Sequence, residues 1–218
     1  MAFAGGALVF PGGRVDAGDH VLAATLAGDR DELAAQIAAI RETLEEAGLP
    51  IGLSPMPDAP ALAGMRRALH AGATFGEALA AARANLDLSA LTPFARWLPA
   101  HRLSRIFDTR FYLARLPAGS PGARVDATEN VRLVWASAAA ILAEADAGQV
   151  TVIYPTRRNL ERLAQFRDIE AAIADAHAHP VATITPVIEE RDGVAHLCIP
   201  AGLGYPITCE PIASATRG

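Results

Sequence analysis

The sequence contains no lysine, because all 19 of its basic residues are arginines. It therefore lacks a Schiff-base or pyridoxal-phosphate lysine, and it lacks the lysine of a phosphate-binding loop. Aromatic residues are scarce at 6%, and the formal net charge is -5. A mildly acidic chain with scattered arginines does not provide the basic face that duplex DNA needs, so we expect no nucleic-acid partner.

Cysteines and long apolar runs are scarce as well. We expect the two cysteines, Cys198 and Cys209, to be reduced and partly buried thiols rather than a disulfide or a zinc site. No apolar run is long enough to span a membrane. Residues 1–10 lack the basic start of a signal peptide. These absences predict a cytoplasmic protein with no membrane partner.

Apolar residues make up 51% of the chain, and their patterning predicts interleaved strands and helices. Strands are expected at 3–10, 49–53, 105–115 and 131–136, and as a hairpin over 181–188 and 194–199 across Asp192-Gly193. Helices are expected at 31–47, 60–71, 75–86, 137–146, 156–166 and 168–178. This order gives an α/β or α+β class.

Local signals support the ends of two of these helices. Asp29 or Asp31 lies near the start of the helix over 31–47, and Gly48 provides a stop after it. Thr156 is the expected N-cap of the helix over 156–166. Residues 12–19 are rich in glycine and predict a loop before the first helix.

The end of the helix over 31–47 carries three glutamates. Glu42, Glu45 and Glu46 share one helix face, where like charges repel by about 0.2–0.5 kcal/mol per pair. The helix dipole also disfavours anions at this end. A bound Mg²⁺ would explain the arrangement, since it is held by carboxylate oxygens. A solvated acidic face, with Arg41 as counter-ion, explains the three glutamates equally well.

The residues upstream favour the metal site. The segment Phe10-Pro11-Gly12-Gly13 precedes Asp19, and Arg41-Glu42-Thr43-Leu44-Glu45-Glu46-Ala47-Gly48-Leu49 follows. Together they resemble the signature of the Nudix hydrolase family, G-x5-E-x7-R-E-U-x-E-E-x-G-U, where U is aliphatic. Gly13 matches its first glycine, and Arg41 to Leu49 match its second half.

The match departs from the family pattern in three ways. Asp19 replaces a glutamate, and Thr43 occupies an aliphatic position. Arg41 follows Asp19 by 22 residues rather than eight, so 14 residues are inserted within the motif, at about 20–33. The insertion leaves the role of Asp19 open.

Further segments resemble one branch of the family, the peroxisomal coenzyme A diphosphatases and their bacterial relatives. They are the second helical insertion at about 54–95, Arg105 to Tyr112, Glu129-Asn130 before Trp135, Tyr154-Pro155-Thr156, and Pro200 to Pro206. The resemblance implies a Nudix α/β/α sandwich with a mixed sheet over residues 1–218 as a single domain. The insertion at 54–95 would be a lid or pocket wall.

The resemblance also implies a metal site and a reaction. Glu42, Glu45 and Glu46, with a backbone carbonyl of Gly12 or Gly13, would hold Mg²⁺ or Mn²⁺. Arg41 would orient the glutamates by paired hydrogen bonds. Either Glu42 or Glu129 would act as the base that takes a proton from the attacking water. Glu129 is equally well explained as a surface glutamate.

Three arginines are candidates for binding substrate phosphates, although each alone is more often a surface or ion-pair residue: Arg14, Arg105 and Arg110. The expected partner is a small nucleotide. Coenzyme A or an acyl-CoA would give 3′,5′-ADP and (acyl-)phosphopantetheine. The alternatives are a broader hydrolase of the ADP-ribose or NADH type and a non-catalytic nucleotide-sensing module. A homodimer is one option for the assembly.

The start of the chain departs from the family arrangement. Nudix domains place a strand before the one that leads into the Phe10-Pro11-Gly12-Gly13 loop, whereas this sequence begins directly with the latter. We therefore expect the chain as given to lack the first strand of the fold, with Met1 an internal residue of a longer protein.

Overall fold

The structure is a computed structural model that describes residues 6–99, 107–123 and 133–215. Its internal contacts divide the chain into two compact units, which are described separately. The first unit is built mainly from Pro11–Thr92 and Ala114–Val134. The second is built from Ala2–Phe10, Pro93–Leu113 and Trp135–Gly218. Among the helices in the described ranges, none has the length and apolar character needed to cross a membrane.

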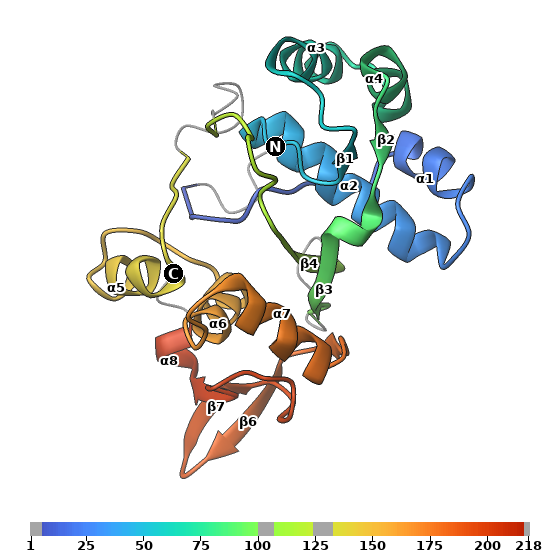
Figure 1. Cartoon of the computed structure of the whole chain (residues 1–218). Helices are drawn as coiled ribbons and strands as arrows, with labels where there is room; N and C mark the ends of the chain where they lie inside the picture. Colours follow the sequence, from blue (N-terminus) through green and yellow to red (C-terminus); the bar gives the residue numbers. More distant parts are fainter. Residues whose placement is uncertain (1–5, 100–106, 124–132, 216–218) are drawn as a thin grey trace. The chain divides into compact units, whose positions relative to one another are not determined.

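Four helices dominate the first unit (Figure 1). They are α1 (Ala17–Ala23), α2 (Arg30–Ala47), α3 (Ala59–His70) and α4 (Phe75–Ala82). Helix α1 contacts α2 and α4, and α3 contacts the same two helices, so the four form a closed ring of contacts. The helical insertion predicted at 54–95 thus supplies α3 and α4.

Helix α2 has strong signals at both ends. The Asp29 side chain caps its start by accepting a hydrogen bond from the N–H of Asp31 at 3.0 Å. Gly48 closes it in the left-handed region, with φ 70°, and donates to the carbonyl of Leu44. Its buried face carries Ala34, Ile37, Ala38, Ile40 and Leu44. The helix predicted over 31–47 is confirmed.

Helices α3 and α4 confirm the two helices predicted in the insertion. Asp58 caps α3, and Thr74 with Glu77 forms a capping box on α4. Helix α4 ends at Ala82, earlier than predicted, because Arg83 takes a left-handed conformation with φ 53°. The flanking chain forms a short antiparallel pair of β1 (Leu53–Ser54) with β2 (Asn85–Leu86), followed by η1 (Leu88–Ala90).

Strand β3 (Leu91–Trp97) is the middle strand of a three-stranded sheet. Its neighbours are β4 (Thr109–Ala114) and β5 (Thr183–Ile184), and the pairing with β5 is parallel. The strand predicted over 105–115 is confirmed for its described part. Strand β3 itself was not predicted, since its segment lies within the range taken as a helical insertion.

Helices α5 (Ala138–Asp146), α6 (Tyr154–Leu163) and α7 (Ile169–Ala178) confirm the three helices predicted in the second half of the chain. The predicted N-cap of α6 is wrong. The helix starts at Tyr154, with Ile153 at the cap, and Thr156 is buried in its first turn. Pro155 lies in that first turn, where its missing N–H costs no helical hydrogen bond, so it does not delay the start.

The predicted hairpin is confirmed as β6 (Val187–Arg191) paired antiparallel with β7 (Val194–Cys198). Its two turn residues, Asp192 and Gly193, have φ 51° and φ 74°, as a type I′ turn requires. Strand β8 (Cys209–Pro211) extends this sheet and leads into α8 (Ile212–Ala215).

The expectation of two reduced thiols is wrong. Cys198 and Cys209 stand opposite each other in the β7–β8 register, with their Cα atoms 4.1 Å apart, and form a disulfide. Tertiary pairing brings the two sulfur atoms together, whereas their separation of 11 residues in the sequence gave no such signal.

Of the strand predicted over 49–53, only Leu53 lies in a strand, β1. Two further predicted strands are largely absent from the described residues. In the described part of 3–10, Ala7 forms a single parallel bridge to Thr151, and the N–H of Leu8 donates to the carbonyl of Thr151. Residues 133–136 form no strand, and Trp135 is 74% exposed. Apolar composition favoured a strand in both segments, but a strand also needs a neighbour to pair with its backbone.

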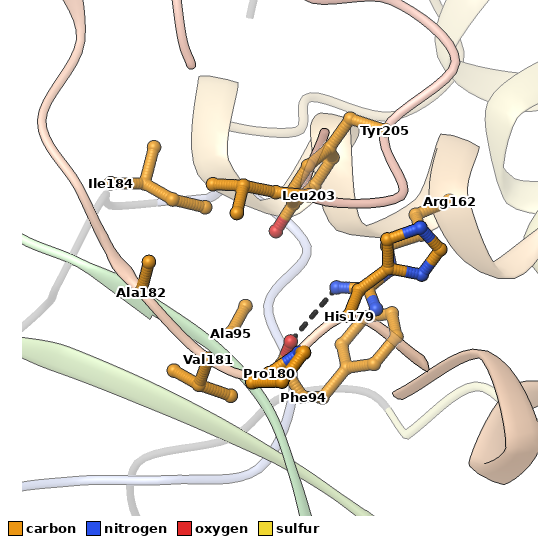
Figure 2. A pocket seen from close by; sticks show the side chains of 10 residues that line it. All are labelled: Phe94, Ala95, Arg162, His179, Pro180, Val181, Ala182, Ile184, Leu203 and Tyr205. Atoms are coloured by element: carbon orange, nitrogen blue, oxygen red, sulfur yellow. Dashed lines mark hydrogen bonds between the residues drawn. The ribbon is translucent and has the colours of Figure 1, made fainter. Parts of the chain in front are cut away.

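The core of the second unit combines the β4–β3–β5 sheet with α7 and later loops. Its buried members are Phe94, Ala95, Trp97, Leu113, Ala172, Ala176, Ile184, Ile199 and Tyr205. A small hollow beside it, with room for about one water molecule, is shown in Figure 2. There Arg162 donates to the carbonyl of Phe94 at 2.9 Å (Figure 2). None of the predicted site residues within the described ranges lines this hollow.

Candidate active site

The three glutamates of the predicted metal site lie on the last turns of α2. The spacing places Glu42, Glu45 and Glu46 on one face, as the sequence predicts. The side chains of Glu42 and Glu45 keep 16% and 24% of their surface exposed, so both are partly buried. The cluster is therefore sheltered but accessible to a small ligand.

Arg41 is buried behind this cluster and contacts carboxylates from two directions. Its Nε donates to Asp19 Oδ1 at 3.1 Å, and one terminal nitrogen donates to Asp19 Oδ2 at 3.0 Å. The other terminal nitrogen donates to Glu42 Oε1 at 2.9 Å and lies 3.5 Å from Glu45 Oε2. Burial lowers the pKa of Arg41, but the carboxylates of Asp19, Glu42 and Asp16 raise it by a larger amount. The net shift of the pKa is therefore upward. The guanidinium is a fixed cation.

Asp19 belongs to α1, and its side chain is 1% exposed. Despite the insertion after it, α1 packs on α2 and brings this carboxylate into a two-pronged contact with Arg41. Asp19 also accepts from the N–H of Asp16 at 2.9 Å. The question that the sequence left open is answered geometrically: Asp19 holds Arg41.

The glycine-rich loop lies directly against the glutamates. The N–H of Gly12 donates to Glu46 Oε2 at 2.9 Å. A Cβ atom at Gly13 would overlap the carboxylate of Glu42, so any other residue here would force that carboxylate to move. Arg41 ties the same loop down by donating to the carbonyl of Arg14 at 2.7 Å. The carbonyl groups of Gly12 and Gly13 remain predicted ligands.

The electrostatics of the cluster fit a divalent cation. Burial raises the pKa of Glu42 to about 7; Arg41 opposes this shift, and Glu45 and Glu46 add to it. The guanidinium of Arg41 is shared by the carboxylates of Asp19, Glu42 and Glu45. A hard cation would relieve this excess of negative charge, because carboxylate oxygens are the ligands that Mg²⁺ and Mn²⁺ prefer. The donor set fits the predicted ion.

Of the remaining predicted residues, the structure describes Arg14 and Arg110. Arg14 contributes its carbonyl, and its side chain is exposed. Arg110 lies in β4 of the second unit, 3.8 Å from the carboxylate of Asp108. Arg105 and Glu129 lie outside the described residues. Their proposed roles remain predictions.

Two residues that the sequence did not assign to the site contact it from α3. Arg66 donates from Nε to the carbonyl of Glu45 at 2.9 Å, and from a terminal nitrogen to that of Glu46 at 3.1 Å. His70 Nδ1 lies 3.5 Å from Glu45 Oε1. No local pattern marks these residues, because their partners lie 20 to 25 positions away in the sequence.

The described features together define a class: an α/β protein in which a glycine-rich loop faces a helix-borne carboxylate cluster around a buried arginine. A solved structure with a similar fold is that of a NUDIX hydrolase from Alicyclobacillus acidocaldarius. The two chains superpose with a TM-score of 0.68 and 27% sequence identity, over 80% of this chain and 83% of that one. The predicted α/β Nudix fold is thereby confirmed, and the likeness supports the Nudix resemblance of the sequence.

Searches by sequence found no relative. No family model matches the chain, and no curated protein sequence matches it. Asp19 and Arg41 are 22 residues apart along the chain, and the fold brings their side chains into contact.

Proposed function

We propose that the protein is a metal-dependent hydrolase that cleaves the diphosphate of a nucleoside diphosphate linked to another moiety. The observation that carries the proposal is the cluster of Glu42, Glu45 and Glu46 around Arg41, closed by the Gly12-Gly13 loop. The likeness to a solved NUDIX hydrolase supports the same reaction class. A module that only senses nucleotides has no need of this carboxylate cluster.

The chain's residues divide the work as follows. Glu42, Glu45 and Glu46, with a carbonyl of Gly12 or Gly13, would hold Mg²⁺ or Mn²⁺. When bound, the ion neutralises diphosphate oxygens and acidifies a water molecule. Arg41 keeps the Glu42 and Glu45 carboxylates in place through its contacts with both. Glu42 or Glu129 would take the proton of the water that attacks phosphorus.

The leading substrate is coenzyme A or an acyl-CoA, with 3′,5′-ADP and (acyl-)phosphopantetheine as products. This preference rests on the branch resemblance of the sequence. Arginines would bind the substrate phosphates, because they are the only strongly basic side chains in the sequence. The proposed ones are Arg14, Arg105 and Arg110. The single domain over residues 1–218, its insertions at 20–33 and 54–95, and the cytoplasmic location remain predictions.

A product analysis tests the proposal. Purified protein is incubated with Mg²⁺ and, in parallel, with coenzyme A, ADP-ribose, NADH and nucleoside triphosphates. We expect 3′,5′-ADP from coenzyme A, and no product when a chelator removes the metal. Turnover of a non-CoA substrate alone would reject the branch and favour a broader hydrolase. Nucleotide binding without turnover of any compound would favour the sensing module.

Melting curves give a second readout that does not depend on knowing the substrate. A ligand that binds the folded state at ten times its Kd raises the free energy of unfolding by about 1.4 kcal/mol. We therefore expect Mg²⁺ or Mn²⁺ to raise the melting temperature, and a monovalent salt at equal ionic strength to leave it unchanged. An unchanged melting temperature at millimolar Mn²⁺ would contradict the metal site.

A further inference from the structure

Arg66 of α3 lies against the end of α2, at the turn that carries Glu45 and Glu46. It donates two hydrogen bonds to the backbone carbonyls of these same two residues. Carbonyl groups in the last turn of a helix have no partner within the helix. The planar guanidinium therefore fixes the stretch of backbone from which two of the proposed metal ligands project.

Gly48 makes this contact possible. It closes α2 with φ 70°, and a Cβ atom at this position would lie 3.2 Å from a terminal nitrogen of Arg66. The glycine thus meets two requirements at once, a left-handed turn and room for the guanidinium. The end of α2 and the inserted helix α3 are fitted to each other at this point.

The charge of Arg66 suits its place. A cation at the C-terminal end of a helix interacts favourably with the helix dipole, whereas the three glutamates at this end do not. Arg66 thereby offsets an arrangement that an isolated helix would disfavour. Its contribution comes from a different helix, beyond the reach of the sequence pattern of α2.

His70 follows one turn later on α3 and approaches the Glu45 side chain itself. Its Nδ1 lies 3.5 Å from Glu45 Oε1, while the other oxygen of that carboxylate lies 3.5 Å from Arg41. The Glu45 carboxylate is therefore placed between an arginine of its own helix and a histidine of the insertion.

We propose that the helical insertion positions the metal ligands, with Arg66 and His70 of α3 as positioning residues for Glu45 and Glu46. Helix α3 would then be part of the metal site. This inference rests on the proposed function, because it requires the glutamates of α2 to bind a divalent cation.

The test measures Mn²⁺ binding to metal-free protein at constant pH, by the electron paramagnetic resonance signal of free Mn²⁺. Replacing a residue that orients metal ligands typically lowers the metal affinity by about 10- to 100-fold. We expect Arg66→Ala to weaken Mn²⁺ binding at least about 10-fold, and His70→Ala to weaken it less. Arg66→Lys should restore part of the affinity, since an ammonium can still donate to a carbonyl.

Arg67→Ala is the matched control, because Arg67 is the adjacent arginine of the same helix and is exposed. Its affinity should stay within about twofold of the wild type, as expected for a surface residue away from the site. In the activity assay, Arg66→Ala should need more Mg²⁺ for half-maximal rate and regain most of its kcat at saturating Mg²⁺. A variant that is merely less folded would not regain kcat in this way.

The outcomes separate the two proposals. If the wild type binds no Mn²⁺, the proposed function fails, and this inference fails with it. If the wild type binds Mn²⁺ and the Arg66→Ala and His70→Ala variants bind it equally well, only this inference is overturned. If Arg66→Ala fails to fold, the Mn²⁺ affinities of Arg66→Lys and His70→Ala test the inference instead. Wild-type affinity in both of these variants would overturn the inference.

Discussion

Two groups of charged residues, one in each unit, use arginine in opposite ways. In the first unit, the carboxylates of Asp19, Glu42 and Glu45 share the guanidinium of Arg41, and His70 approaches Glu45 as well. In the second unit, α6 carries Arg158 and Arg162, whose side chains are only 1% and 2% exposed. Each of these arginines has its own carboxylate partners.

The second group is balanced. Arg158 lies 2.8 Å from Glu161 and 3.1 Å from Glu210, and Arg162 lies 2.8 Å from Asp175. Burial raises the pKa of Glu161, as it does for Glu42, but Glu161 faces two arginines and one glutamate, whereas Glu42 faces one arginine and two glutamates. The buried ion pairs of α6 hold the fold together. The partly buried glutamates of α2, which outnumber the arginine they contact, are suited to binding a cation.

The Arg162 network gives the largest expected effect. Arg162→Ala would remove the arginine partner of the partly buried Asp175, which keeps its contact with His179, and would remove a cation from the ring of Phe94, whose centroid is 4.2 Å away. Breaking a buried ion pair by removing one partner costs about 3–5 kcal/mol. We expect the free energy of unfolding, measured by urea denaturation, to fall by this amount.

Arg167→Ala provides the control in the same region. The side chain of Arg167 is 89% exposed, and it contacts only its neighbour Asp168 among the ion pairs described. A change below about 0.5 kcal/mol is expected. If Arg162→Ala and Arg167→Ala lower the free energy of unfolding equally, the buried arginine does not differ from the surface arginine in its contribution to stability.

The glutamates of α2 give the next largest effect. Glu45→Gln and Glu46→Gln each remove a negative charge from the proposed ligands while keeping the shape of the side chain. We expect turnover to fall at least about 100-fold, which corresponds to about 2.7 kcal/mol, because an amide is a poor substitute for a carboxylate at Mg²⁺. The measurement is initial rate at saturating Mg²⁺.

Glu32→Gln, the same substitution at the other end of α2, should retain wild-type turnover. Stability should change little in all three variants, since the Gln variants also remove like-charge repulsion. Unchanged turnover in both Glu45→Gln and Glu46→Gln would contradict the proposed metal site. The three glutamates would then be explained as a solvated acidic face.

The cap of α2 gives the smallest effect. Asp29→Ala removes the acceptor for the N–H groups that start the helix, and loss of such a cap costs about 1 kcal/mol. Thermal denaturation should show this loss, while Mn²⁺ affinity of the folded protein stays unchanged because the cap lies at the opposite end of α2. A large change in Mn²⁺ affinity would show that the cluster depends on the whole helix.

Most helices could be predicted because their signals are local. Asp29 and Gly48 bound α2, Asp168 caps α7, and Asp192-Gly193 sets the hairpin turn. Short strands were harder to predict. Residues 133–136 have strand-forming side chains and no pairing partner among the described residues, whereas β3 pairs with β5 from a distant part of the sequence.

The candidate site divides in the same way. The glutamates of α2 are recognisable from spacing, since a helix of 3.6 residues per turn places Glu42, Glu45 and Glu46 on one face. The roles of Arg41 and the two loop glycines were implied by the resemblance to the Nudix signature. Spacing did not reveal that Asp19 would still reach Arg41 across the inserted residues. It also did not reveal the contact of Arg66 with the last turn of α2.

The sequence by itself determined the carboxylate face of α2, the ends of its main helices and the absence of lysine chemistry, because these depend on composition and on neighbours within a few residues. The tertiary structure decided the Asp19–Arg41 pair, the Arg66 and His70 contacts, and the Cys198–Cys209 disulfide. Each of these joins residues between 11 and 25 positions apart, and only the packing of one element on another brings such side chains within bonding distance.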